Sequence, residues 1–195
     1  LETYVQHDII ISPQGLEEYL HSYISVLPYN ELGAAAAAYN ADEKELCRLD
    51  EIYSAVKAPF EIRSGSEKVT RRFFKICDNG QESFTGLYKS LTEQGKCKGH
   101  QCIAYGLYMR DNGIELPEGL AVYGYSICSA IVTNCVKLVP LSQLAGQKIL
   151  GESFELISSA AEKALFSDIN DIGISGAGFD LRAMQHERLY SRQYM

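Results

Sequence analysis

Two cysteines and a histidine lie within six residues of one another, in the stretch CKGHQC at 97–102. Thiolate and imidazole groups are ligands that zinc, nickel and copper prefer in proteins. Cys97, His100 and Cys102 are therefore candidate metal ligands. A second pair of ligands at matching spacing is absent from the sequence. The competing interpretation is that Cys102 faces a core, because a free thiol packs as a small hydrophobic group.

The other histidines and cysteines form no catalytic pattern. His7 and His21 stand alone as candidate bases, and Cys128 and Cys135 lie seven residues apart, a spacing typical of packing. No Ser-His-Asp or Cys-His arrangement follows from the spacing. The glycines of GISGAGFD lack the Gly-Lys-Ser/Thr of a phosphate-binding loop. These absences favour a protein that is not an enzyme, and we expect no cofactor.

The C-terminal stretch HERLYSRQYM is basic, although the chain has a formal net charge of −7. In a helix, His186 and Tyr190 share a face, and Arg188 and Arg192 lie four residues apart and repel each other. Arginine and tyrosine are frequent anchors of protein interfaces. The pattern predicts a docking tail that becomes ordered when it binds a partner.

A second candidate interface lies in VKLVPLSQLAGQKIL at 136–150. Gln143 and Gln147 are four residues apart and share a helix face. Gly146 costs about 1 kcal/mol relative to alanine in a helix interior, which suggests close approach of another backbone. That neighbour is either a helix of the same chain or a partner that meets a surface formed by Lys137, Gln143 and Gln147.

Helical periodicity extends over most of the chain. Ser12 and Pro13 form a cap and a first helical position, apolar residues then recur three or four apart, and Pro28 ends this helix. The further helices are expected over residues 31–41, 43–57, 66–78, 82–93, 100–110, 117–137 and 141–165. Ser66 is the expected cap of the helix over 66–78. The pattern predicts an all-α, single-domain bundle of about eight to ten helices.

Composition and helical periodicity divide the chain into three parts. We expect a helical bundle over 1–167, a Gly-rich linker over 168–180 and the docking tail over 181–195, with a short tail helix capped by Asp180. The helix over 117–137 is apolar on all sides and is expected at the centre of the bundle.

Composition limits the class of protein. An acidic chain argues against nucleic acid as the main partner. No apolar run approaches the roughly 20 residues of a membrane span, so we expect no membrane partner. No secretory signal is visible, and six cysteines, mostly at apolar positions, indicate reduced thiols and a cytoplasmic protein. The chain starts at Leu1 without a methionine, so we expect that upstream residues are missing.

Three stretches resemble one family, the urease accessory protein UreF. LETYV at 1–5 is similar to the end of the family's N-terminal segment. VKLVPLSQLAGQ at 136–147 resembles the signature Arg/Lys-Leu-x-Pro-Leu-Gly-Gln-x-x-Gly-Gln, and MQHERLYSR at 184–192 resembles His-Glu-x-x-Tyr-Ser-Arg. The chain departs from the pattern at Ser142, where the family has glycine, and in its final RQYM, where the family has Arg-Leu-Phe.

The resemblance implies an all-α assembly factor, or chaperone, without catalytic activity that acts in nickel delivery to the urease apoprotein. Members of the family bind the UreD/UreH scaffold and the UreG GTPase, are proposed to modulate GTP hydrolysis, and often form homodimers. By this resemblance, the scaffold-binding residues are His186, Glu187, Tyr190, Ser191 and Arg192. Lys137, Gln143 and Gln147 would lie near the GTPase-facing surface. The alternative left open is a nickel-binding carrier that uses Cys97, His100 and Cys102.

Overall fold

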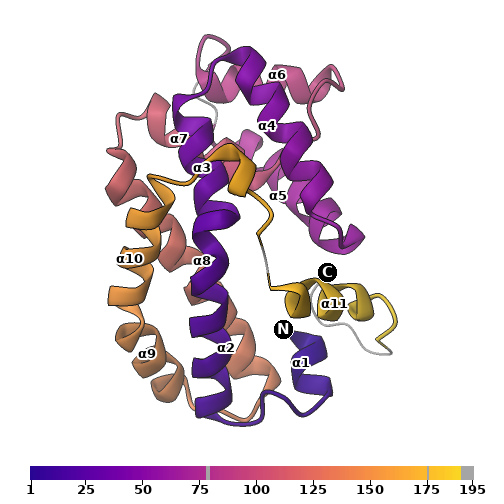
Figure 1. The fold of residues 1–195 in the computed structure, drawn as a ribbon, viewed down its shortest axis with the longest axis vertical. Coiled ribbons are helices and arrows are strands. Elements are labelled where there is room, and N and C mark those ends of the chain that lie inside the picture. Colours follow the sequence, from indigo (N-terminus) through magenta and orange to yellow (C-terminus); the bar gives the residue numbers. More distant parts are fainter. Residues whose placement is uncertain (78–79, 175, 190–195) are drawn as a thin grey trace.

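The computed structural model describes residues 1–77, 80–174 and 176–189, and these ranges contain α-helices and short 3-10 helices but no strand (Figure 1). The expected all-α class is confirmed. The helices are α1 (Glu2–Gln6), α2 (Pro13–Val26), η1 (Leu27–Tyr29), α3 (Glu31–Asn40), α4 (Glu43–Val56), α5 (Phe60–Ile76), α6 (Phe84–Glu93), α7 (Gln101–Asp111), α8 (Leu116–Leu138), α9 (Gln143–Glu152), α10 (Phe154–Ala164), η2 (Ile169–Asp171) and α11 (Ala177–His186).

Local sequence explains several helix starts. The Ser12 hydroxyl accepts a hydrogen bond from the backbone N–H of Gly15 at 3.2 Å, and Pro13 is the first residue of α2, as predicted. Asp42 and Glu45 form a capping box at the start of α4. Each of these interactions satisfies N–H groups that a helix start leaves without an intrahelical partner.

Three helix boundaries differ from the prediction. α5 begins at Phe60, after Pro59, so Ser66 lies inside the helix. The single helix expected over 141–165 is two helices that meet at Ser153, whose hydroxyl donates to the carbonyl of Ile149 and helps to end α9. α11 begins at Ala177, so Asp180 lies in its first turn instead of at its cap.

The alanine-rich helix α3 packs directly on α7. Ala34, Ala35 and Ala38 are fully buried. A Cβ atom built at Gly106 of α7 would lie 2.2 Å from the carbonyl oxygen of Ala35, so the two backbones touch at this point. Small side chains on both helices permit this approach, because the distance between packed helices depends on the side chains at the contact.

α8 is less enclosed than expected. One face packs against α2, α3 and α10, whereas Val122 and Tyr125 are exposed on another. By length and composition α8 could cross a membrane, which corrects the expectation that no segment is long enough; 39% of its most apolar window is buried. A core helix of a soluble protein has the same length and composition, so this observation is weak evidence for a membrane span.

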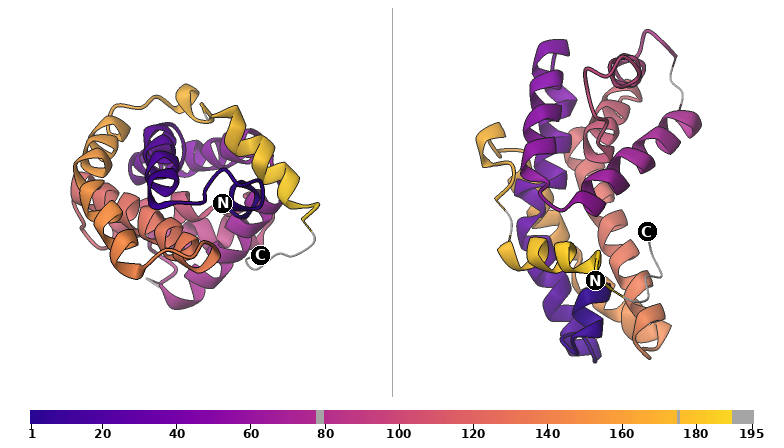
Figure 2. Two further views of the ribbon diagram at one scale, coloured as in Figure 1. Left: turned by 90° about the horizontal axis from the view of Figure 1, so that it is seen from below. Right: turned by 90° about the vertical axis from the view of Figure 1, so that its right-hand side faces the viewer.

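The two ends of the described chain meet on one side of the molecule. α11 lies beside α1 and reaches α5, as two further views show (Figure 2). The segment before α11 is tied to the body, because the N–H of Gly173 donates to the carbonyl of Tyr29 and Asn30 donates to the carbonyl of Ile174. The division of the chain into bundle, linker and tail stays a prediction.

Candidate docking site at the C-terminal helix

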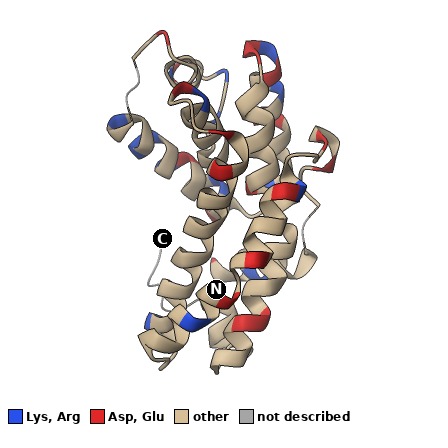
Figure 3. Ribbon diagram, turned by 90° about the vertical axis from the view of Figure 1, so that its left-hand side faces the viewer, with Lys and Arg blue, Asp and Glu red and all other residues tan. Residues whose placement is uncertain are grey.

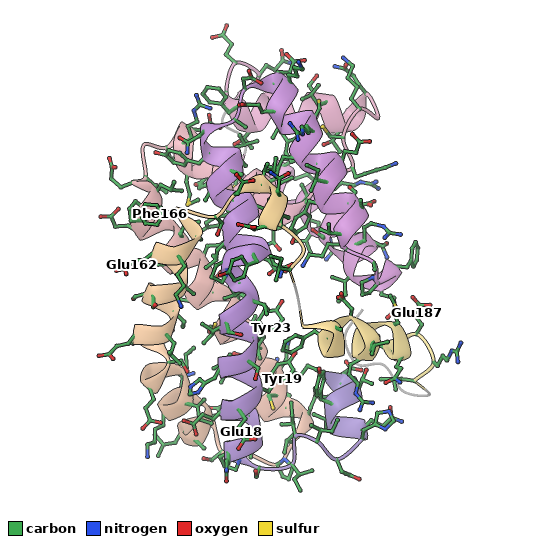
Figure 4. All side chains as sticks on the ribbon, viewed as in Figure 1. Glu18, Tyr19, Tyr23, Glu162, Phe166 and Glu187 are labelled. Carbon is green, nitrogen blue, oxygen red and sulfur yellow. The ribbon has the colours of Figure 1, made fainter. Side chains whose placement is uncertain are left out.

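An aromatic cluster seats the start of α11 on the body. The ring of Phe179 lies 5.4 to 6.1 Å, between centroids, from those of Tyr4, Tyr19 and Tyr23. Tyr19 and Tyr23 lie on the side of α2 that faces α11 (Figure 4). The Glu31 carboxylate, followed by burial, holds the pKa of Tyr23 well above its usual 10, so this phenol is neutral. Edge-to-face aromatic packing of this kind contributes about 0.5–1.5 kcal/mol per pair beyond burial.

His186 joins the end of α11 to two carboxylates from distant parts of the chain. Its Nδ1 lies 2.5 Å from Oε2 of Glu61 on α5, and its Nε2 lies 3.2 Å from Oε2 of Glu2 on α1. Both ring nitrogens must carry a proton for both contacts to be hydrogen bonds, because a carboxylate only accepts. The hydroxyl of Thr3 adds a bond to the carbonyl of Arg182 at 2.9 Å.

The predicted scaffold-binding residues therefore have different environments. His186 faces the body, whereas Glu187 is exposed at the end of α11 (Figure 4). Tyr190, Ser191 and Arg192 lie outside the described residues. The sequence analysis did not identify Glu2 and Glu61 as partners of His186, and no local pattern would have revealed them, since they lie 184 and 125 positions away.

The three residues of the predicted GTPase-facing surface are all exposed. Lys137 lies in the last turn of α8, and Gln143 and Gln147 lie on α9. Leu144 between them is also exposed. A Cβ atom at Gly146 would lie 2.8 Å from a methyl group of Val136 on α8. The close approach at Gly146 is therefore explained by a helix of the same chain, and the three polar side chains stay available to a partner.

The CKGHQC residues do not form a ligand set. His100 is fully buried, with Nε2 2.8 Å from the Ser54 hydroxyl and Nδ1 3.4 Å from that of Ser66. Burial raises the pKa of the Cys102 thiol to about 12, so this sulfur stays protonated. Within the part of the chain that the structure describes, no group of three or more His, Cys, Asp or Glu side chains is placed to hold a metal ion.

A buried aspartate organises this stretch instead. Asp50 on α4 accepts hydrogen bonds from the hydroxyl of Tyr88 at 2.6 Å and from the backbone N–H groups of Lys98 and Gly99 at 2.7 and 3.0 Å. The N–H of His100 donates in turn to the Tyr88 oxygen at 2.8 Å. This network joins α4, α6 and the start of α7, and the sequence analysis did not predict it.

Comparison with known proteins identifies the family of this chain. The UreF family model matches residues 10–153. The urease accessory protein UreF of Haemophilus influenzae strain ATCC 51907 / DSM 11121 / KW20 / Rd is 34% identical over 202 residues, covering 100% of this chain and 86% of the relative. Its counterpart in Actinobacillus pleuropneumoniae serotype 5b strain L20 is 32% identical over 201 residues, covering 100% of this chain and 88% of the relative. The chain therefore belongs to the UreF family of urease accessory proteins.

Proposed function

We propose that this chain is a cytoplasmic, non-enzymatic assembly factor for nickel insertion into urease. In this proposal it docks on the UreD/UreH scaffold through α11 and the residues that follow it. It presents its body to the UreG GTPase, modulates GTP hydrolysis, and acts on the urease apoprotein as a homodimer. The chain itself holds no nickel in this scheme, and it needs neither nucleic acid nor a membrane.

The docking proposal rests on one observation, that the rest of the chain covers α11 only in part. None of its residues is buried, although the helix rests on the body through Phe179 and His186. Its outward stripe contains Leu181, 61% exposed, and Met184, 42% exposed, with Arg188 one turn further along. An apolar stripe that ends in arginine suits burial by a second protein, because arginine and large apolar side chains are common interface anchors.

Support for a bridging role comes from the separation of two exposed surfaces. Lys137 lies on α8, and Gln143 and Gln147 lie on α9, whereas α11 packs mainly against α1 and α5. A scaffold that covered α11 would leave these side chains accessible. The proposed GTPase contact and the proposed scaffold contact are therefore compatible in one complex.

Co-expression with the UreD/UreH scaffold, followed by size-exclusion chromatography, tests the proposal. We expect Leu181→Glu with Met184→Glu to abolish co-elution, because two buried charges would enter the interface. The matched control Leu144→Glu, on α9, should retain the scaffold and weaken a subsequent complex with UreG. A scaffold complex that survives the α11 double variant unchanged would refute docking through this helix.

A further inference from the structure

Positive charge is concentrated in one part of an acidic chain. Residues 60–98 contain eight Lys or Arg and five Asp or Glu, a net charge of +3, whereas the remaining residues contain ten and twenty, a net charge of −10. This segment comprises α5, α6 and the loop before α7. Lys and Arg mark the projecting end of α5, while Asp and Glu are spread over much of the rest (Figure 3). The asymmetry gives the molecule a surface that attracts acidic groups.

Four of these eight basic residues line a cleft of about 570 Å³ between α5, α6 and the loop that follows α6. Phe74 and Cys97, both buried, form apolar parts of its lining. Ile76, at the end of α5 beside Lys75, is 82% exposed. The charged residues of the lining are Arg71, Lys75, Lys89, Lys98, Glu67 and Glu93. The cleft thus combines converging positive charge with apolar surface.

Interactions among the described residues account for little of the charge at Arg71, Lys75 and Lys98. Arg71 is 3.9 Å from Glu67, but its side chain is 66% exposed, so this ion pair is weak. Lys75 lies in the last turn of α5, where a cation interacts favourably with the helix dipole. That effect does not explain Lys98, which comes from another element. The ammonium groups of Lys75 and Lys98 make no hydrogen bond or ion pair with the residues that the structure describes.

We propose that this cleft binds an acidic, partly apolar peptide segment of a protein partner. The carboxylates of Glu67 and Glu93 would repel a compact polyanion such as a polyphosphate, but they can accept N–H groups of a peptide backbone. The concave shape suits a peptide better than the flat surface of a membrane. The occupant has carboxylates spaced along an extended chain, with an apolar side chain that covers Phe74 or Ile76. This site is separate from α11 and does not depend on the proposed scaffold contact.

Fluorescence anisotropy with the whole chain tests this inference. The probe is a short labelled peptide of alternating glutamate and leucine, and the reference probe has glutamine in place of every glutamate. We expect binding of the glutamate peptide only, at low ionic strength because added salt screens exposed charges. Lys75→Glu with Lys98→Glu should weaken this binding at least about tenfold, since charge pairs across an interface contribute strongly to association.

The matched control reverses two exposed lysines away from the cleft, Lys148→Glu with Lys163→Glu, and changes the net charge by the same amount. We expect this control to bind the peptide within about twofold of the parent chain. Equal losses in both double variants would overturn the inference, because net charge alone would then explain binding. The milder pair Lys75→Gln with Lys98→Gln should weaken binding in the same direction, and circular dichroism checks that all variants are folded.

Two further outcomes would also overturn it. Competition by inorganic tripolyphosphate as effective as that by the unlabelled peptide would identify a general anion site. Co-sedimentation of the chain with phosphatidylserine vesicles, without measurable peptide binding, would identify a membrane-facing surface. Peptide binding that depends on Lys75 and Lys98 and resists competition by tripolyphosphate would support the proposal.

Discussion

His186 on α11 and Glu61 on α5 lie 125 positions apart in the sequence, yet Nδ1 of the imidazole is 2.5 Å from Oε2 of the carboxylate. The same ring reaches Glu2 on α1 through its other nitrogen. One side chain of α11 thus joins the C-terminal helix to α1, at the other end of the chain, and to α5. This contact helps to fix where the end of α11 rests on the body.

Glu61→Gln should loosen α11 without unfolding the bundle. The neutral amide keeps the size of the side chain but removes the charge that faces His186, and we expect faster amide hydrogen exchange over residues 177–189. The free energy of global unfolding should change by less than about 1 kcal/mol, because the pair is partly exposed. Hydrogen-exchange mass spectrometry measures this, with Glu155→Gln on α10 as a control that should leave exchange unaltered. Unchanged protection in the Glu61 variant would contradict the role assigned to this contact.

Two glycine substitutions should change stability in opposite directions. Gly106→Ala places a methyl group against the carbonyl of Ala35 and forces α3 and α7 apart, so it should cost about 1–3 kcal/mol or more. Gly65→Ala, inside α5, meets no atom within 4 Å and should stabilise the fold by about 0.5–1 kcal/mol. The urea denaturation midpoints of both variants, compared with that of the parent chain, test these opposite effects on stability. Similar midpoints for the two would mean that α3 and α7 are less closely packed than the structure shows.

Asp50→Ala should be among the most damaging single substitutions. It leaves Tyr88 and two backbone N–H groups without their buried acceptor, and we expect a loss of about 3 kcal/mol or more in the free energy of unfolding. Asp111→Ala provides a matched comparison. Asp111 also accepts two backbone N–H bonds, from Phe84 and Thr85, but at the exposed start of α6, and its loss should cost only about 1 kcal/mol. If chemical denaturation showed a larger loss of unfolding free energy for Asp111→Ala than for Asp50→Ala, the Asp50 network would contribute little to stability.

The buried imidazole of His100 should make the fold sensitive to mild acid. Burial lowers the pKa of His100 below its ordinary 6.5; Asp50 opposes this shift, and Lys57 and Arg63 add to it. The unfolded chain then binds a proton more readily than the folded chain, so the free energy of unfolding should fall as pH drops below about 6.5. His100→Asn should make this decline less steep, whereas the exposed His7→Asn should preserve it. Denaturation at a series of pH values measures the slopes, and parallel curves for the parent and His100→Asn would refute this contribution.

The positions of most helices could be predicted from the sequence, because helix formation depends on residues within a turn of one another. The stripe of Leu16, Leu20 and Ile24 is buried as its spacing indicates, and Ser12 caps α2. The break between α9 and α10 was missed, since a single serine, Ser153, bonds back to its own helix there. The CKGHQC stretch has residue types typical of metal ligands, but that pattern does not show where each side chain points.

The sequence by itself determined the all-α class, the approximate helices and, through its signatures, the family to which the chain belongs. Only the tertiary structure decided that His186 turns toward Glu2 and Glu61, that His100 is buried against Ser54, and that basic side chains of α5 and α6 surround one cleft. The physical reason is the range of the interactions. Caps and apolar periodicity act over a few neighbouring residues, whereas these contacts join segments that meet only when the helices pack.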